Sequence, residues 1–315
     1  MSRPRNKSSS VRISVIIPVF NGERTIRAAI DSALAQEFEG SEVVVVNDGS
    51  TDSTQRILEG YGDRIKLVTQ ANRGVCVARN VCVAASSGKY LAFLDADDEF
   101  LPGKLERSYR ALEQNPGAAL VFSDLVTIDS RGDEIDIPPI GHAPTMEEML
   151  SRGWPILPTG AVMPRAVFDR CGGFCEDFER PGGDDAYLWL LAREQGEFIY
   201  IAEQLALHRN ASALVLAKKY QPGFRIFHRL VRARYGSQAD GLIRDGRHFL
   251  SALYIAGAMN LMDEGDMRGA LSAWMSATRH RPAMLLDHSM LSRFFVARNL
   301  RRLVKGIGIA VTRRA

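Results

Sequence analysis

Short apolar runs alternate with amphipathic stretches over the first hundred residues of this chain. Four runs are rich in apolar and β-branched residues and predict strands: Ile13–Ile17, Val43–Val46, Ile65–Thr69 and Tyr90–Leu94. Between them, helix caps or apolar residues at helical spacing predict three helices: Thr25–Gln36, Asp52–Tyr61 and Val75–Ala85. The two longest apolar runs have no polar face, as expected for strands that are covered on both sides.

Repeated strand–helix–strand units without long gaps predict an α/β fold with a doubly wound, mostly parallel sheet. In such sheets the ligand site lies at the carboxyl ends of the strands. We therefore expect the functional residues to lie directly after Ile17, Val46 and Leu94.

The pattern loosens after residue 100 and becomes helical after residue 212. The sequence predicts a helix over 103–114, a strand over 119–128 and a polar turn over 130–134. Further along, it predicts helices over 248–264, 266–278 and 291–309. We divide the chain into a tail (1–11), an α/β domain (12–212, with halves 12–100 and 101–212) and a helical extension (213–315).

Composition and charge narrow the function. A net charge of +3 over 315 residues, without interleaved aromatic and basic residues in the first two hundred, argues against nucleic acid as a partner. Residues 1–12 contain four basic residues and no acid, which is typical of a disordered basic tail.

The four cysteines form no Cys-x-x-Cys pair, and we expect reduced thiols in a cytoplasmic protein. A metal site built from Cys171, Cys175 and a histidine would be poorly spaced for zinc. No apolar run approaches the roughly 18 residues that span a bilayer, which also favours a cytoplasmic location.

Carboxylates follow two of the predicted strands. Asp95 and Asp97 are two residues apart, so on an extended chain they point to the same side. Two unpaired carboxylates would repel each other, whereas Mn²⁺ or Mg²⁺, completed by substrate phosphates and water, removes that repulsion. The alternative is that Asp97 and Asp98 cap the following helix.

Asp48 ends an apolar strand and precedes a glycine. A carboxylate in this crevice can accept hydrogen bonds from a nucleobase N–H or from a ribose hydroxyl. The alternative is a turn-forming Asp before Gly, which is a common use of the pair.

An ordered series of motifs over residues 12–212 resembles the signature of family-two inverting glycosyltransferases. The fragments are Pro18-Val19-Phe20-Asn21, Val45-Val46-Asn47-Asp48-Gly49-Ser50-Thr51-Asp52, Asn72-Arg73-Gly74, Ala78-Arg79-Asn80, Gly88-Lys89-Tyr90 and Leu94-Asp95-Ala96-Asp97-Asp98. The resemblance implies a glycosyltransferase A-type fold that binds a nucleotide sugar, commonly a UDP-sugar. It also implies that 12–100 is the nucleotide-binding half and 101–212 the acceptor-side half.

The resemblance also assigns roles to individual residues. Pro18, Phe20, Asn21 and Asp48 fall in the segments that hold the donor, with uracil and ribose at Pro18, Phe20 and Asp48. Arg79 falls near the diphosphate, and Asp95 and Asp97 match the motif for metal and ribose. Asn47 departs from the family, in which many members have a second Asp; we expect little consequence.

The acceptor side of an inverting transferase supplies the base. Gly182-Gly183-Asp184-Asp185 resembles the family segment that usually reads Glu-Asp, and Asp185 is our candidate base. Both aspartates begin a predicted apolar helix, whose N-terminal dipole is expected to favour their ionised form. The alternative is an N-cap at Asp184 and a solvated Asp185.

His208 follows an apolar strand, and the resemblance implies that it helps to ligate the metal or the diphosphate. A structural histidine is the alternative. The predicted metal ligands are therefore Asp95, Asp97 and His208.

The C-terminal segment 290–315 is basic and amphipathic, which suits an anionic membrane surface at the inner face of the membrane. A helix packed on the core is the alternative. Residues 248–282 resemble one tetratricopeptide-like helix pair, which is too short for a solenoid.

The leading hypothesis is an inverting, metal-dependent transferase that adds a sugar to a glycan or lipid-linked acceptor of the cell surface. A sugar-1-phosphate nucleotidyltransferase is a second hypothesis, but it would require a glycine-rich basic loop after the first strand, and Pro18-Val19-Phe20-Asn21 is not one. A non-enzymatic nucleotide-sugar-binding scaffold is the third; it would have no need to keep all of Asp48, Asp95, Asp97 and Asp185.

Overall fold

A computed structural model describes residues 11–129, 131–152, 156–178, 181–210, 213–264 and 266–280. Nine strands belong to one sheet: β1 (Ile13–Val19), β2 (Ser41–Asp48), β3 (Lys66–Gln70), β4 (Tyr90–Phe93), β5 (Glu99–Phe100), β6 (Ala118–Ile128), β7 (Glu134–Ile135), β8 (Ala161–Pro164) and β9 (Glu197–Arg209). Their order is β3-β2-β1-β4-β8-β6-β9-β5, and β7 pairs with β6.

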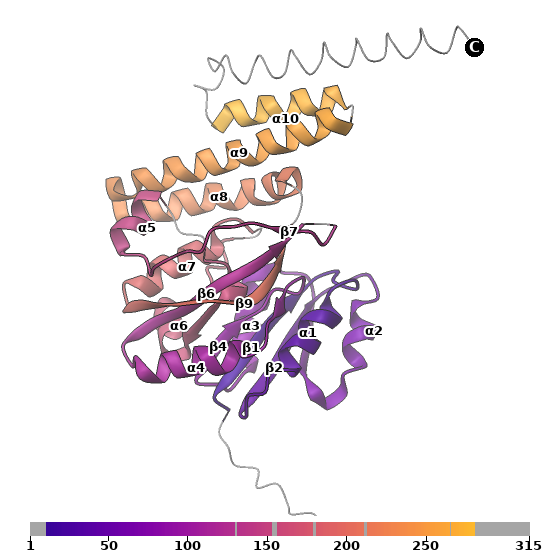
Figure 1. Ribbon diagram of the computed structural model, residues 1–315, viewed down its shortest axis with the longest axis vertical. Helices are drawn as coiled ribbons and strands as arrows, with labels where there is room; N and C mark the ends of the chain where they lie inside the picture. Colours follow the sequence, from indigo (N-terminus) through magenta and orange to yellow (C-terminus); the bar gives the residue numbers. More distant parts are fainter. Residues whose placement is uncertain are drawn as a thin grey trace, which may run out of the picture. The chain divides into compact units, whose positions relative to one another are not determined.

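The helices are α1 (Ile26–Leu34), α2 (Thr54–Glu59), α3 (Val75–Ala85), α4 (Lys104–Gln114), α5 (Met146–Arg152), α6 (Arg165–Cys171), α7 (Asp184–Arg193), α8 (Ala213–Tyr235), α9 (Asp240–Glu264) and α10 (Met267–His280). Helices α1 and α4 pack in one hydrophobic core on one face of the sheet, and α3, α6 and α7 pack in another on the opposite face. Figure 1 shows the sheet between them. The strand alternation explains this arrangement, because Ile16 and Ile17 enter different cores.

The predicted strands and helices of the first 128 residues are present, and the α/β fold class is confirmed. The parallel pairs are β1 with β2 and β4, β2 with β3, and β6 with β9. Strand β8 is antiparallel to both of its neighbours and divides the parallel N-terminal half from the second half. The sequence pattern indicated strands in the second half but not their directions.

Contacts divide the chain into two compact units, one comprising 1–211 with 219–243 and the other 212–218 with 244–315. The division differs from a boundary at residue 212, because most of α8 packs with the first unit: Phe227 and Val231 belong to its core. Buried aromatic and small side chains are available on this face of α8, so it joins the α/β domain.

The second unit contains the helix pair expected over 248–278. Its core consists of Ala217, Tyr254, Ala258, Ala273, Trp274 and Ala277, and the Ser251 hydroxyl donates to the Ala277 carbonyl at 3.2 Å. The basic segment 290–315 and residues 1–10 of the tail lie outside the described residues. In the part of the chain that is described, no helix combines the length and the apolarity needed to cross a bilayer.

Candidate active site

The carboxyl ends of β1, β2 and β4 meet at one edge of the sheet, as predicted. Strand β1 lies between the other two and is parallel to both, with Val19 opposite Asn47 and Ile16 opposite Phe93. Phe20 directly follows β1, Asp48 is the last residue of β2, and Asp95 lies in the loop after β4. One sheet edge therefore brings together the candidate donor residues.

Hydrogen bonds from backbone N–H groups to side-chain oxygens connect the loops after β1 and β2. Asn21 has a positive φ of 53°, its amide N–H donates to Ser50 Oγ at 2.9 Å, and its Oδ1 accepts from the Thr51 N–H at 2.7 Å. Asn47 Oδ1 accepts from the Ser50 N–H at 3.0 Å, so the asparagine that departs from the family pattern shapes this loop.

The two predicted base-binding residues of β1 differ in accessibility. Pro18 is buried within the strand, whereas the Phe20 side chain is 49% exposed at its end. An exposed aromatic ring beside a polar loop can stack on a planar base. Phe20 is therefore the better placed of the two for side-chain contact.

Asp48 is buried and holds the start of α3. Its Oδ1 accepts from the Arg73 N–H at 2.9 Å and from Gln70 Nε2 at 2.7 Å, and its Oδ2 accepts from the Gly74 N–H at 2.9 Å. These partners lie more than twenty residues along the chain, so Asp48 does more than form a local turn before Gly49. Its contact with a nucleotide stays a prediction.

Arg79 connects the two sides of the site. Its Nη2 donates to Asp95 Oδ1 at 2.7 Å, and its Nη1 donates to Asp184 Oδ2 at 2.8 Å. Its Cζ lies 5.0 Å from the centre of the Phe174 ring. Burial disfavours the charge, but the two carboxylates outweigh it and raise the pKa of Arg79 above its ordinary value.

This geometry changes the interpretation of Arg79. The guanidinium is buried, and both of its terminal nitrogens face carboxylates of this chain. Its Nε is also buried and makes no hydrogen bond within the described residues. Arg79 therefore positions Asp95 and Asp184, and its predicted contact with a diphosphate stays untested.

Asp184 and Asp185 begin α7, behind Gly183 as the N-cap. Asp184 is buried, pairs with Arg79 and accepts from the Gly182 N–H at 2.9 Å. Asp185 is half-buried, and its Oδ1 accepts from the Ala186 N–H at 2.8 Å. The N-cap is thus a glycine, and the alternative of an Asp184 cap is wrong.

The expected effect of the helix dipole on Asp185 is outweighed by burial and by a neighbouring charge. Burial first, and then the negative charge of Asp184, raise the pKa of Asp185 to about 7. Desolvation exceeds the effect of one helix terminus, because a dipole contributes only about 0.3–1 kcal/mol at an ordinary site. A carboxylate that titrates near neutral pH suits a general base.

Asp98 and Thr159, both buried, form a polar cluster with the partly buried His208. Thr159 Oγ1 donates to Asp98 Oδ2 at 2.6 Å, His208 Nδ1 lies 3.1 Å from Asp98 Oδ1, and the Arg209 N–H donates to Asp98 Oδ1 at 3.0 Å. Helix α4 begins only at Lys104, so the alternative that Asp97 and Asp98 cap it is wrong.

Negative charge gathers around His208. Burial lowers its pKa, but the hydrogen bond that the ring donates to Asp98 and the charges of Asp98, Asp95 and Asp97 outweigh burial and raise the pKa above its ordinary value. An imidazole whose Nδ1 faces a carboxylate presents its other nitrogen to a ligand in many metal sites. The charge of this cluster therefore fits a divalent cation.

The predicted ligands do not, however, form a complete metal site. In the described parts of the chain, no three or more His, Cys, Asp or Glu side chains are grouped to hold a metal ion. Arg79 donates to one oxygen of Asp95, and Asp98 faces His208 Nδ1. A site that uses one or two carboxylates and is completed by phosphate oxygens needs no such group.

Thr159 is a site residue that the sequence did not reveal. It lies in the short 3₁₀ turn Pro158–Gly160 and is fully buried, and its Oγ1 also accepts from the Asp95 N–H at 3.3 Å. Thr159 thus connects the loop after β4 with Asp98. A single threonine between Pro and Gly carries no signal of its partner 61 residues away.

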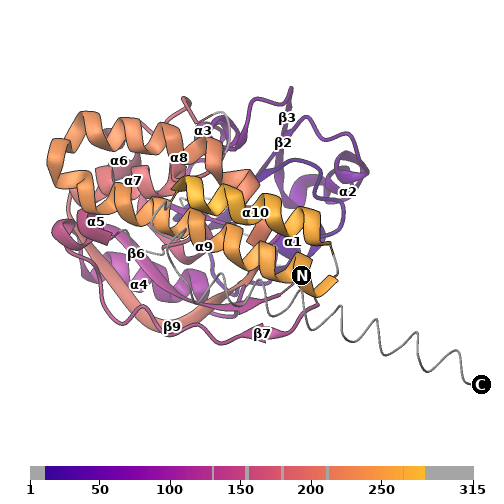
Figure 2. The same cartoon turned by 90° about the horizontal axis from the view of Figure 1, so that it is seen from above.

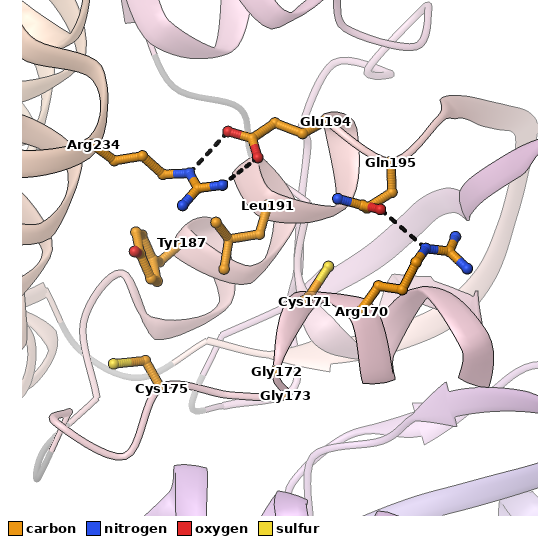
Figure 3. A pocket seen from close by; sticks show the side chains of 10 residues that line it. All are labelled: Arg170, Cys171, Gly172, Gly173, Cys175, Tyr187, Leu191, Glu194, Gln195 and Arg234. Carbon is orange, nitrogen blue, oxygen red and sulfur yellow. Dashed lines mark hydrogen bonds and ion pairs between the residues drawn. The ribbon is translucent and has the colours of Figure 1, made fainter.

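A separate cavity of about 360 Å³ lies beside α6 and α7 (Figure 3). The residues that line it are Arg170, Cys171, Gly172, Gly173, Cys175, Tyr187, Leu191, Glu194, Gln195 and Arg234. None of the predicted site residues is among them. Arg234 Nε and Nη2 both donate to the Glu194 carboxylate, and burial raises the pKa of the Cys171 thiol to about 11, so this thiol stays protonated.

Known proteins resemble the chain in sequence. An uncharacterized glycosyltransferase of Rickettsia prowazekii is 43% identical over 102 residues, which is 32% of each chain. The putative glycosyltransferase EpsE of Bacillus subtilis is 29% identical over 199 residues, covering 60% of this chain and 69% of EpsE. The matched region spans about a third or less of the first curated relatives.

Solved structures of S. aureus TarS resemble the fold. TarS 1–349 in complex with UDP gives a TM-score of 0.53 at 16% identity, covering 86% of this chain and 92% of that chain. TarS 1–349 in complex with UDP-GlcNAc gives a TM-score of 0.51 at 14% identity. The sequence model of glycosyl transferase family 2 matches residues 14–172, half of the chain, and together with the sheet and its polar edge this match shows that the chain belongs to glycosyl transferase family 2.

Proposed function

We propose that this chain transfers a sugar from a nucleotide sugar, a UDP-sugar in the first instance, to a hydroxyl of a glycan or lipid-linked acceptor, with inversion at the anomeric carbon. The observation that carries the proposal is the double ion pair of Arg79. The buried Arg79 guanidinium pairs with Asp95, which lies on the predicted donor side, and with Asp184, which precedes the predicted base. The fold likeness to TarS, which is solved with UDP and with UDP-GlcNAc, supports the choice of donor.

Inverting transfer is a single displacement. The acceptor oxygen forms a bond to the anomeric carbon while the bond from that carbon to the diphosphate oxygen breaks, and a base takes the proton of the acceptor hydroxyl. Asp185 is the proposed base, since its raised pKa of about 7 makes it a proton acceptor at neutral pH. Phe20 and Asp48 are proposed to bind the base and ribose of the donor.

Asp95 and Asp97 are proposed to hold Mn²⁺ or Mg²⁺, with His208 adjoining. The cation would stabilise the negative charge of the leaving diphosphate. The support is electrostatic: the charges of Asp95, Asp97 and Asp98 all raise the pKa of His208, so negative charge gathers where a cation is needed. In this arrangement Asp98 orients His208 through its contact with Nδ1.

The contacts of the loop after β1 argue against the nucleotidyltransferase hypothesis. Such an enzyme would need free backbone N–H groups after β1 to cradle phosphates. Here the N–H groups of Asn21, Gly22 and Glu23 donate to the side chains of Ser50, Thr54 and Asp52, at 2.9, 2.9 and 3.2 Å.

The first experiment is a thermal-shift panel of UDP-, GDP- and dTDP-sugars with and without Mn²⁺. We expect at least one UDP-sugar to raise the melting temperature, and to raise it further when Mn²⁺ is present. The absence of any shift across the panel would overturn the proposed donor class.

The second experiment separates binding from chemistry. Asp185→Asn is expected to abolish transfer while donor binding remains near that of the wild type. Asp177→Asn, an exposed aspartate paired with Arg229, is the matched control and is expected to leave both unchanged. Loss of donor binding in Asp185→Asn would assign Asp185 another role.

Attachment to an anionic membrane through residues 290–315 is a further part of the proposal and rests on sequence alone. Full-length protein and a chain ending at residue 289 would be compared for binding to vesicles of phosphatidylglycerol and phosphatidylcholine at low salt. Equal binding by the two chains would remove this segment from the proposal.

A further inference from the structure

The segment Asp95–Asp98 forms a tight turn after β4. The Asp98 N–H donates to the Asp95 carbonyl at 3.1 Å, and Ala96 and Asp97 are the two central residues of the turn. The extended chain expected here from the sequence is therefore wrong. The directions in which Asp95 and Asp97 point depend instead on what holds the two ends of the turn.

One buried hydroxyl contacts both ends of this turn. Thr159 Oγ1 donates to Asp98 Oδ2 at 2.6 Å and accepts from the Asp95 N–H at 3.3 Å. A hydroxyl has one proton and two lone pairs, so it can make both contacts at once. Thr159 is 0% exposed and Asp98 is 1% exposed, so neither contact is open to solvent. Thr159 thus fixes the two ends of the turn relative to each other.

Asp98 extends this connection to the predicted metal ligand of β9. Its other oxygen, Oδ1, accepts from the Arg209 N–H at 3.0 Å and lies 3.1 Å from His208 Nδ1. Strand β9 carries His208 and runs alongside β6 (Figure 2). Thr159 and Asp98 therefore connect the turn after β4 with the histidine, so both segments that supply predicted metal ligands share one support.

The 3₁₀ turn Pro158–Gly160, which contains Thr159, is itself held by close contacts. The Gly160 carbonyl accepts from the buried Lys104 Nζ at 2.6 Å. A Cβ on Gly160 would lie 3.1 Å from the Ser123 carbonyl oxygen, so the turn packs closely against β6. A tightly packed turn suits a residue that fixes the geometry of a site, because such a residue must not move with the groups that it orients.

We propose that Thr159 is a positioning residue for the divalent cation. Its hydroxyl fixes the turn that carries Asp95 and Asp97, and through Asp98 it also fixes His208. Thr159 touches neither the cation nor the donor and acts through these side chains. Replacing a residue that orients metal ligands typically lowers metal affinity by about 10–100-fold. The inference rests on the proposed function, in which Asp95 and Asp97 hold Mn²⁺ or Mg²⁺, and deepens it.

The test compares Thr159→Val, Thr159→Ser and Thr278→Val in the full chain. Valine removes the hydroxyl and keeps the shape of the side chain, whereas serine keeps the hydroxyl. Thr278 is the matched control, because it is also buried and its hydroxyl donates to the Met275 carbonyl of the same helix at 2.9 Å. Thr159→Ala takes the place of Thr159→Val, with the same expected result, if the valine variant does not fold.

Each protein is titrated with Mn²⁺ in the presence of UDP, and free Mn²⁺ is measured by electron paramagnetic resonance. We expect Thr159→Val to raise the dissociation constant of Mn²⁺ about tenfold, with UDP affinity in the absence of metal unchanged. Thr159→Ser should recover most of the Mn²⁺ affinity. Both valine variants lose a buried hydrogen bond and should lower the urea midpoint, but Thr278→Val should bind Mn²⁺ as the wild type does.

Other results would overturn the inference in distinguishable ways. Wild-type Mn²⁺ affinity in Thr159→Val, or equal losses in the two valine variants, would leave the proposed function intact and remove Thr159 from it. Serine that binds Mn²⁺ as weakly as valine would make the role one of packing. A wild type that binds UDP but no Mn²⁺ would remove the proposed metal together with this inference, and a wild type that binds neither would also count against the proposed donor.

Discussion

Arg79 Nη1 lies 2.8 Å from Asp184 Oδ2, so an arginine of α3 forms an ion pair with the first residue of α7, 105 residues later in the chain. Both side chains are only 6% exposed. A pair this well buried is costly to break, because removing Arg79 leaves the buried Asp184 carboxylate without this counter-ion.

Arg79→Met is therefore expected to destabilise the chain by roughly 3–5 kcal/mol. Urea unfolding followed by circular dichroism measures the change. Arg73→Met is the control, since Arg73 Nη2 lies 3.8 Å from Glu176 Oε2 and both side chains are more than half exposed. That variant should lose less than about 1 kcal/mol. Similar losses in the two variants would contradict the structural role given to Arg79.

The rate of transfer should depend on pH through Asp185. Burial and the charge of Asp184 raise the pKa of Asp185 from 3.8 to about 7, and the base acts in its ionised form. The kcat/KM profile should therefore rise with pH and level off above about 7. Replacing Asp184 by Asn removes the like charge and should move the inflection to lower pH. A profile that is flat from pH 5 to 8 in both proteins would contradict the assignment.

The raised pKa of Asp185 should make the folded chain less stable as pH rises, whereas it makes transfer faster. Because the folded pKa of Asp185 exceeds the unfolded value, the folded chain binds more protons between about pH 4 and 7. The contribution of Asp185 to the free energy of unfolding should therefore fall as pH rises through this window. Urea unfolding of the wild type and of Asp185→Asn at a series of pH values measures this contribution as the difference between their midpoints. A difference that does not change with pH would contradict the raised pKa.

Local pattern was sufficient for the elements of the first 128 residues and for the sheet edge, because strand alternation, helical spacing and glycine turns are encoded within a few residues. Asp48 and Asp95 became candidates through their positions at strand ends, and Asp185 became one through a family resemblance at the start of a predicted helix. The partners of Arg79 and Asp98 were not identified, since Asp184 and Thr159 are 105 and 61 residues away and only the folded sheet brings them close. The raised pKa of Asp185 was not predicted for the same reason: burial depends on packing that the local sequence does not describe.

His208 is expected to titrate above its ordinary pKa of 6.5, because Asp98, Asp95 and Asp97 favour the imidazolium more than burial disfavours it. The stability that this pair contributes is fully present below pH 6.5 and is lost as pH rises through the folded value. NMR titration of the histidine ring protons measures the pKa. Asp98→Asn should lower it, while Asp133→Asn, an exposed aspartate outside the cluster, should not. An unchanged His208 pKa in Asp98→Asn would contradict the pairing.

Lys104 supplies a prediction about stability at alkaline pH. Its Nζ is buried, donating to the Gly160 carbonyl at 2.6 Å and to Ser123 Oγ at 3.1 Å, and burial lowers the pKa of Lys104 from 10.5 to about 7. Between these two values the unfolded chain binds more protons than the folded chain, so the free energy of unfolding should rise with pH.

Lys104→Met removes this dependence. The difference in unfolding free energy between wild type and Lys104→Met should grow by a few kcal/mol, in favour of the wild type, from pH 7 to pH 10. Subtracting the variant cancels the titration of the other groups, and Lys89→Met, an exposed lysine paired with Glu113, provides a control whose difference stays flat over this range. Parallel profiles for wild type and Lys104→Met would mean that Lys104 keeps its proton in the folded chain, held by the Gly160 carbonyl despite its burial.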